Sequence, residues 1–278
     1  MTFSYPDFLY FLLLAIIQGI TEFLPVSSSG HLVLLPKFIN HNDQGLSIDV
    51  AAHVGTLVAV MIYVRSDLTK MTITLKNKAL NTFKTEAYKP IDEQSLKICK
   101  LLIIATIPVL IAGFLISLFE PDILRLIQTV AISNIIFAAF LWHSDRTISS
   151  KYSMDRMSLK EAIVIGFVQI LAFIPGTSRS GITMTAGRYL GFERTVAARF
   201  SLLLSIPVIL GAGFLQSLKL IQQENYSIGS SAIFVAVISC IVALIAIHGM
   251  MLWLKRANFR IFVLYRISLG VLILAISL

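Results

Sequence analysis

Two short stretches of the sequence place polar groups that could handle phosphate inside otherwise apolar surroundings. The first runs from Gln18 to His31 and reads Gln-Gly-Ile-Thr-Glu-Phe-Leu-Pro-Val-Ser-Ser-Ser-Gly-His. The second runs from Pro175 to Gly181 and reads Pro-Gly-Thr-Ser-Arg-Ser-Gly. At membrane depth such groups are costly unless each has a partner or a task. We therefore take these two stretches as the candidate functional site.

The first stretch begins with a helix that carries an acid. Gln18 and Glu22 are four residues apart, so they would share one face of that helix. Pro25 would end the helix, because its ring removes a donor and clashes with the preceding turn. We expect Glu22 to face a wet cavity or a cation. The simpler alternative is that its carboxylate only caps a neighbouring helix end.

Hydroxyls and an imidazole follow the proline. The serines suit the N-cap of a second short helix, whose free N–H groups would bind phosphate oxygens. His31 could serve as a general acid, a nucleophile or a metal ligand. The alternative is that the serines cap and pack and that the imidazole is merely hydrogen-bonded. The three serines are Ser27, Ser28 and Ser29.

The second stretch contributes a guanidinium. Arg179 is always charged and needs an anion at membrane depth, and phosphate matches its bidentate geometry. The hydroxyls of Thr177, Ser178 and Ser180 lie beside it in the sequence and could bind the same phosphate. The alternative is a purely structural ion pair between Arg179 and Glu22. Together the two stretches suit phosphoryl transfer, in which a divalent cation and the arginine neutralise phosphate while a hydroxyl or water attacks phosphorus.

Composition identifies the kind of protein that must position these groups. The chain has 278 residues, of which 56% are hydrophobic and only 14% charged. A soluble domain has about 25% charged residues. The chain is therefore expected to be an integral membrane protein. Its net charge of +8 is attributed to basic cytoplasmic loops, and nucleic-acid binding is not expected.

The apolar runs predict an all-α polytopic membrane protein that forms a single integral domain over residues 1–278. Runs interrupted by Gly, Pro and Ser favour a helical bundle over a β-barrel. The segments around Pro25 and Pro175 each break, pass through hydroxyls and resume as a short apolar piece, so we predict two re-entrant helical hairpins. Six further runs can cross the membrane: Leu46–Val64, Ile98–Phe119, Ile123–Trp142, Val196–Leu218, Ala232–Leu254 and Ile261–Leu278.

Two matches within the chain predict an internal repeat. Residues 22–28 resemble residues 172–178, which pairs Ser28 with Ser178, and Val-Ala-Ala-His53 resembles Val-Ala-Ala-Arg199. We expect one repeat over about residues 1–143 and another over about residues 158–278. Each would hold one hairpin and three spans. Because three is odd, the second repeat would be inverted, with a site between the halves.

Charge placement supports the hairpins. The loop from Arg65 to Lys100 is basic, as are the loop around Arg146 and the pair Lys255 and Arg256. With two hairpins all three lie on one side, which is then cytoplasmic. The first hairpin would open outward and the second inward. If both proline segments were kinked spans instead, Lys255 and Arg256 would fall on the opposite side.

The two stretches together resemble the signature motifs of the bacterial undecaprenyl-diphosphate phosphatases of the bacitracin-resistance type. The likeness covers essentially the whole chain. It implies removal of one phosphate from undecaprenyl diphosphate, which recycles the lipid carrier of peptidoglycan and cell-wall polymer synthesis and confers bacitracin resistance. It also implies a plasma-membrane enzyme with inverted repeats, an active site open to the extracytoplasmic side, and a need for Mg²⁺ or Ca²⁺.

The resemblance also implies roles for single residues. Glu22 matches the family's essential glutamate, Ser28 the serine proposed as nucleophile, His31 the motif histidine and Arg179 the phosphate-binding arginine. Gln18 matches a position that is Glu or Gln in the family; as a metal ligand beside Glu22 it would lack one negative charge. The mechanism expected is attack by Ser28 on the terminal phosphorus, with Glu22 or His31 taking the proton. Attack by water or by His31 stays open.

A transporter or flippase for a phosphorylated lipid is the competing class, because inverted repeats and broken helices aimed at an anion are also transporter features. The enzyme is favoured because transport requires no nucleophile such as Ser28. The partners expected are the lipid substrate and membrane lipids. A homodimer is left open.

Overall fold

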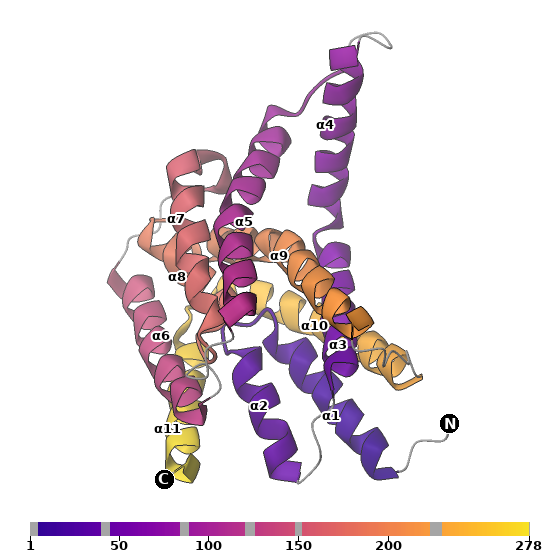
Figure 1. The fold of residues 1–278 in the computed structure, drawn as a ribbon. Helices are drawn as coiled ribbons and strands as arrows, with labels where there is room; N and C mark the ends of the chain where they lie inside the picture. The colour runs from indigo at the N-terminus through magenta and orange to yellow at the C-terminus, as the bar shows by residue number, and fades with distance from the viewer. Residues whose placement is uncertain are drawn as a thin grey trace.

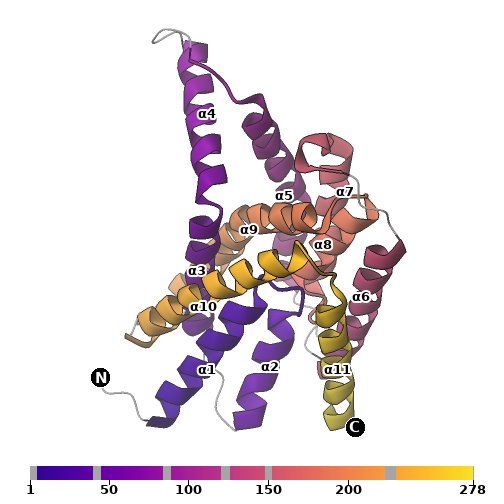
Figure 2. The same ribbon diagram turned by 180° about the vertical axis from the view of Figure 1, so that it is seen from behind.

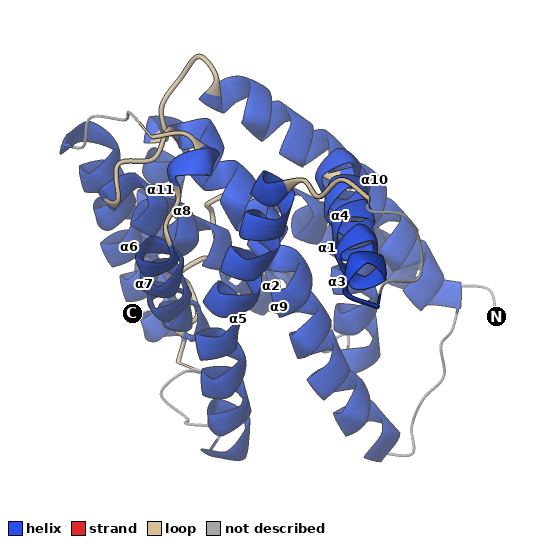
Figure 3. Ribbon diagram, turned by 90° about the horizontal axis from the view of Figure 1, so that it is seen from above, coloured by secondary structure: helices blue, strands red, loops and turns tan. Residues whose placement is uncertain are grey.

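The structure is a computed structural model that describes residues 5–39, 45–83, 89–119, 126–147, 152–222 and 230–277. Within these ranges helices account for nearly every residue, and Figures 1 and 3 show them packed as one bundle with no strand in the described parts. The predicted all-α class is therefore confirmed.

Six of the helices are long and apolar enough to cross a membrane, which confirms a polytopic membrane protein. Several extend beyond the predicted apolar runs into polar residues, as α5 does at Glu93 and α6 at Thr147. The bundle's outer face carries exposed aliphatic and aromatic side chains, as a lipid-facing surface does. The six helices are α3 (Leu46–Tyr63), α5 (Glu93–Phe119), α6 (Ile127–Thr147), α9 (Arg194–Gln222), α10 (Ser230–Leu254) and α11 (Arg260–Ser277).

Two pairs of shorter helices occupy the proline segments. In Figure 1, α1 (Tyr5–Thr21) runs from one end of the bundle toward its centre, and α2 (Ser28–Ile39) runs from the centre back toward the same end. The second pair consists of α7 (Leu159–Gln169), which continues into the 3₁₀ turn η3 (Ile170–Phe173), and α8 (Arg179–Tyr189). The chain between the two helices of each pair, residues 22–27 in the first pair and residues 174–178 in the second, forms a break. The two breaks lie together at the centre of the bundle. Re-entry of these pairs into the membrane stays a prediction.

The two breaks share a backbone device. Ser27 and Ser178 are the residues other than glycine with positive φ in the described chain, at 72° and 69°, and each immediately precedes a helix. The Oγ of each lies 3.2 Å from the Oγ of the serine two residues later, Ser29 and Ser180. The equivalence suggested by sequence is therefore wrong by one residue: Ser27, and not Ser28, corresponds to Ser178. Ser28 and Arg179 are the matching first residues of α2 and α8.

A buried charge cluster fixes the end of the bundle at which α6 ends and α11 begins. Asp145 in α6 accepts hydrogen bonds from Arg188 Nε (3.1 Å) and Arg194 Nε (2.6 Å) and from the backbone N–H of Phe259 (3.1 Å). Arg188 also donates to the carbonyl of Phe192. One carboxylate thus joins α6, α8, the start of α9 and the turn before α11.

Helix α4 (Arg65–Phe83) follows α3 and projects from the bundle, as Figures 1 and 2 show. It forms the first part of the basic loop predicted from Arg65 to Lys100, of which residues 84–88 lie outside the described chain. Most of its side chains are exposed, among them Lys70, Lys76 and Lys78.

Close helix packing depends on glycines. Helix α10 lies along α3 and α1, and α5 lies along α7. A methyl group at Gly55 in α3 would lie 2.1 Å from the carbonyl oxygen of Ala236 in α10. At Gly166 in α7 it would lie 2.6 Å from the carbonyl oxygen of Ala105 in α5. No larger residue fits either position unless the helices move apart.

We predict that Gly55→Ala lowers the thermal unfolding midpoint in detergent, because overpacking costs about 1–3 kcal/mol. Gly249→Ala is the matched control, since no atom lies within 4 Å of a methyl group there, and it should be neutral or stabilise by up to about 1 kcal/mol. Equal midpoints for the two variants would contradict the close contact between α3 and α10.

Candidate functional site

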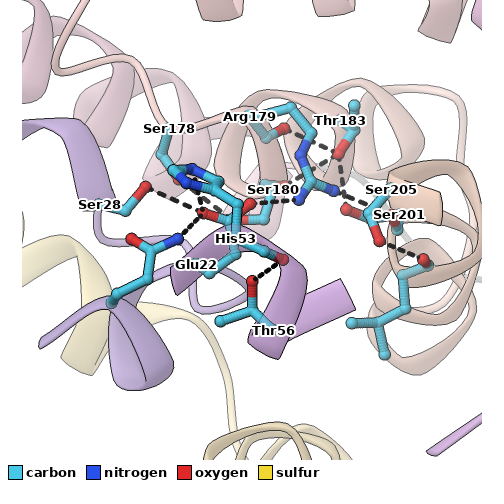
Figure 4. Close-up of polar contacts among 12 residues, drawn as sticks. Glu22, Ser28, His53, Thr56, Ser178, Arg179, Ser180, Thr183, Ser201 and Ser205 are labelled. Carbon is cyan, nitrogen blue, oxygen red and sulfur yellow. Dashed lines mark hydrogen bonds and ion pairs between the residues drawn. The ribbon is translucent and has the colours of Figure 1, made fainter. Parts of the chain in front are cut away.

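The centre of the site is an ion pair between the two breaks. Arg179 Nη2 donates to Glu22 Oε1 over 2.9 Å. Both side chains are largely buried, with 13% and 8% of their surfaces exposed. Figure 4 shows the guanidinium and the carboxylate facing each other, one from each pair of short helices. The sequence placed these two residues at the site, and the structure brings them into contact.

Three further groups converge on the other oxygen of Glu22. Gln18 Nε2 donates to Oε2 over 2.9 Å, and Ser28 Oγ donates to the same oxygen over 3.3 Å. His53 Nε2 lies 3.7 Å from the same oxygen. Glu22 therefore touches a hydroxyl that could act as nucleophile, an imidazole and a guanidinium at once.

Hydroxyl groups dock the two breaks against each other. Ser180 Oγ donates to the carbonyl of Leu24 over 2.9 Å, and the backbone N–H of Gly176 donates to Ser29 Oγ over 3.3 Å. Ser133 in α6 donates to the carbonyl of Pro175. These bonds run from one break to the other and to α6, so the facing positions of Glu22 and Arg179 are held by the backbone as well as by their charges.

The remaining contacts of Arg179 come from the first break and α9. Its Nη1 donates to the carbonyl of Ser201 over 3.4 Å, and its guanidinium lies 5.7 Å from the ring centre of Phe23. Thr183, one turn further along α8, shares a 2.7 Å hydrogen bond with the Ser201 hydroxyl. The arginine is thus held over an aromatic face, where a cation is favourable.

A cavity of about 280 Å³ opens at the ion pair. Its polar floor is formed by Glu22, Ser28, His53 and Arg179, with Ser29 and Ser178 beside them. Its apolar wall comes from α5 and α9, through residues such as Val109 and Ile209. The cavity can therefore receive a molecule with an anionic end and an apolar body.

The hydroxyls expected to bind phosphate divide into two groups. Ser28, Ser29 and Ser178 line the cavity. Ser27, Thr177 and Ser180 are buried outside its lining, where Ser27 bonds Ser29 and Ser180 bonds the carbonyl of Leu24. In the structure these two hold the breaks in shape.

His31 lies away from the ion pair. Its Nδ1 lies 2.7 Å from the carbonyl oxygen of Ser27, and its Nε2 contacts the hydroxyl of Tyr265 in α11. A carbonyl can only accept, so Nδ1 carries the hydrogen and Nε2 of the neutral ring accepts from Tyr265. The imidazole thus braces the positive-φ residue before α2. The imidazole beside Glu22 belongs to His53.

Two residues of the site were not predicted from the sequence. His53 was noted only as the repeat partner of Arg199, yet its Nδ1 bonds the carbonyl of Asp49 and its Nε2 faces Glu22. Arg266 in α11 was not singled out at all. A positively charged residue at mid-span of an apolar segment is the signal that could have identified Arg266.

Arg266 in α11 binds the backbone of the loop before α8. It is fully buried, and its Nη2 donates to the carbonyls of Gly176 (2.9 Å) and Thr177 (2.8 Å). Its Nε donates to Asn134 Oδ1 over 2.7 Å, and a methyl group at Gly181 would lie 2.9 Å from its Nη1. Among the described residues its hydrogen-bond partners are carbonyl oxygens of the backbone and of an amide side chain and not carboxylates, so this arginine adds positive charge directly behind the loop that carries Arg179.

Oxygen ligands for a hard cation are present but few. Among the described residues no group of three or more His, Cys, Asp or Glu side chains could enclose a metal ion. The carboxylate of Glu22 is one possible ligand once a substrate draws Arg179 away from it, and in the described structure Gln18 Oε1 is buried without a hydrogen-bond partner. Mg²⁺ usually keeps several waters and binds one or two carboxylates together with substrate phosphates. The residues fit a cation of that kind, held largely by a phosphorylated ligand.

Comparison with known proteins gives a single family. The family model described as "Bacitracin resistance protein BacA" matches residues 11–272. A protein of Alteromonas mediterranea named undecaprenyl-diphosphatase is 43% identical over 263 residues, which cover 95% of this chain and 96% of that protein. Proteins of the same name from Alcanivorax borkumensis and Roseobacter denitrificans are 43% and 42% identical, over 96% and 95% of this chain and 98% and 97% of their own lengths.

The contacts of Arg266 generate a prediction. Arg266→Met should raise amide hydrogen exchange at residues 176–181 by about tenfold or more, because the two hydrogen bonds from its side chain to the carbonyls of this loop, worth about 1 kcal/mol each, are lost. Mass spectrometry of exchanged peptides measures this. Arg260→Met, an exposed arginine of the same helix, is the control. Unchanged exchange in this loop, or an equal rise across all helices, would show that Arg266 does not hold it.

Proposed function

The chain belongs to the bacitracin resistance protein BacA family, and on that premise we propose that it is an undecaprenyl-diphosphatase, a phosphatase that hydrolyses undecaprenyl diphosphate to undecaprenyl phosphate and inorganic phosphate. The observation that carries the proposal is the contact of Glu22 with both Arg179 and Ser28 at the polar floor of an otherwise apolar cavity. Glu22 as base, Ser28 as nucleophile and the Arg179 guanidinium as the phosphate-binding group are therefore in contact with one another through the Glu22 carboxylate.

The reaction recycles the lipid carrier for peptidoglycan and other cell-wall polymers, and it accounts for the bacitracin resistance in the family's name. The protein is a multi-pass membrane protein. We assign it to the bacterial plasma membrane with its active site facing the extracytoplasmic side. The support is that the basic segments all lie on one side in the hairpin topology. Assembly as a homodimer stays a prediction.

Substrate binding follows from the charges of the site. In the free protein Arg179 is neutralised by Glu22. A diphosphate brings more negative charge than one carboxylate, so its terminal phosphate would draw the guanidinium away and leave Glu22 free as a base. Arg266 adds its positive charge from behind the loop at Gly176 and Thr177. The first isoprene units would lie against the wall formed by α5 and α9.

The chemical step uses Ser28 and Glu22. Ser28 Oγ attacks the terminal phosphorus while its proton passes to Glu22 Oε2, which lies 3.3 Å away and would move closer in the complex. The bond from phosphorus to the bridging oxygen breaks, and undecaprenyl phosphate leaves. Glu22 then gives up the proton that it took from Ser28 to solvent. Water attacks the phosphoserine while Glu22 takes a proton from it, the bond from phosphorus to Ser28 Oγ breaks, and Glu22 returns the proton to that oxygen as inorganic phosphate leaves. Direct attack by water is the competing path.

Histidines support these proton transfers. The Nδ1–H of His53 donates to the carbonyl of Asp49, so its Nε2 is available to exchange a proton with Glu22. His31 acts by holding Ser27 and hence the start of α2, where Ser28 is the first residue. In this arrangement His53 relays protons and His31 sets the position of the nucleophile.

A divalent cation, Mg²⁺ or Ca²⁺, fits the site through Glu22 and the amide oxygen of Gln18. When bound it would neutralise charge on the diphosphate. The chain's own contribution to neutralisation comes from Arg179.

Phosphate release from undecaprenyl diphosphate by the purified protein in detergent tests the function. Wild type should release phosphate and a chelator should suppress it. Glu22→Gln should reduce the rate by about 10²–10⁴-fold through loss of the base. Glu193→Gln, an exposed carboxylate outside the cavity, should leave it unchanged. Movement of the lipid between membrane leaflets without phosphate release would identify a transporter and refute the enzyme.

A trapping experiment tests the nucleophile. Acid quenching during turnover of substrate labelled with ³²P at the terminal phosphate should yield a labelled peptide containing Ser28. Ser28→Ala should lose the label and at least about a thousandfold in rate. Ser205→Ala is the control, since in the described part of the chain this buried hydroxyl of α9 donates to the carbonyl of Leu202, within its own helix. Near-normal activity in Ser28→Ala would instead support direct attack by water.

A further inference from the structure

A second cavity lies at the end of the bundle at which α6 ends and α11 begins. Its volume is about 740 Å³, larger than that at the ion pair. It shares no lining residue with the catalytic cavity, and nothing in the proposed reaction uses it. Its walls come from α6, from the start of α9, and from α11 with the turn before it, and they include Trp142, Arg146, Arg260 and Leu264.

The cavity is strongly positive. Arg146, Arg194 and Arg260 line it, and Asp145 is its one acidic lining residue. Both oxygens of Asp145 are already engaged, Oδ1 by Arg188 and Arg194 and Oδ2 by the N–H of Phe259. The carboxylate is therefore more than neutralised by its own partners and does not cancel the charge of the remaining arginines.

Arg146 and Arg260 are the arginines available to a ligand. Within the part of the chain that the structure describes, no ion pair joins either of them to a carboxylate. The guanidinium of Arg146 lies 4.9 Å from the ring centre of Trp142, which holds it at the cavity wall. The backbone N–H of Arg260 donates to Asn258 Oδ1, which fixes the start of α11 beside it. Two planar guanidinium groups thus border one cavity, and phosphate is the anion that matches their geometry.

The other side of the cavity is apolar and continues onto the outer surface of the bundle. Trp142 and Leu264 line the cavity and still expose 43% and 54% of their surfaces. Phe140 and Ile261 lie beside them in sequence and are also exposed. A tryptophan next to arginines is typical of the boundary between lipid headgroups and acyl chains. The ligand should therefore carry both a phosphate and a hydrocarbon chain.

We infer that this cavity binds the headgroup of an anionic phospholipid, with the phosphodiester between Arg146 and Arg260 and an acyl chain running over Trp142 and Leu264. The exposed pair Lys255 and Arg256 lies in the turn just before the cavity residue Asn258, so this end of the bundle would face the anionic leaflet. Basic pockets between membrane helices recognise such lipids. The inference does not depend on the proposed phosphatase activity.

Quenching of tryptophan fluorescence by brominated lipid tests the inference. The chain has two tryptophans, so Trp253→Phe leaves Trp142 as the reporter at the site. In micelles of the purified full chain, phosphatidylglycerol with brominated acyl chains should quench Trp142 at about tenfold lower concentration than brominated phosphatidylcholine. In the same background, Arg146→Gln with Arg260→Gln should abolish that preference.

A charge-matched variant completes the test. Lys255→Gln with Arg256→Gln removes the same number of positive charges from the same end but leaves the cavity lining intact, so the preference should persist. The thermal unfolding midpoint in detergent should be that of the Trp253→Phe background in both pairs, which shows that the variants fold. Equal quenching by the two lipids, or full preference in the Arg146 and Arg260 variant, would overturn the site. Displacement of brominated phosphatidylglycerol by millimolar inorganic phosphate or glycerol phosphate would also overturn it, in favour of a soluble anion site.

Discussion

One buried carboxylate paired with one buried guanidinium holds the centre of this protein together. Taking both charges out of water is costly, and removing either partner alone would leave the other charge buried without its counter-charge. Glu22 and Arg179 therefore constrain each other, and through them the two broken helix pairs must stay docked. The hydrogen bonds from the Ser180 hydroxyl to the carbonyl of Leu24 and from the N–H of Gly176 to the Ser29 hydroxyl also join the two breaks. The Glu22 carboxylate and the Arg179 guanidinium therefore contribute both to the stability of the bundle and to the proposed reaction.

The backbone at the breaks explains why those atoms are available. Helix α1 ends at Thr21 and the turn η3 at Phe173, shortly before Pro25 and Pro175, which cannot continue a helix. The positive φ of Ser27 and Ser178 then turns the chain so that a new helix starts at the next residue. A continuous helix would satisfy its backbone internally and present only side chains to the interior. A broken one exposes carbonyl and N–H groups where the other break can bind them. Irregular backbone inside the bundle is tolerated because its polar groups find partners in the surrounding protein.

Much of this arrangement could be predicted from the sequence, because long apolar runs and prolines determine where helices form and where they stop. The pairing of Glu22 with Arg179 was also accessible, since lone opposite charges in apolar surroundings seek each other. The sign of φ at Ser27 is not encoded by residue type, so the match of the two breaks was predicted one residue out of register. The contacts of His53 and Arg266 depend on how α3 and α11 pack, which no local pattern specifies.

Ser28 and Arg179 occupy matching positions, each the first residue after its break. The two breaks have the same backbone geometry, but they carry different functional groups. In the proposed reaction Ser28 supplies the hydroxyl oxygen that attacks phosphorus, and Arg179 supplies the positive charge that binds the phosphate under attack. Neither half is a catalyst by itself. A chain cut between them would yield two inert pieces, and reactivity would return only when the pieces reassembled.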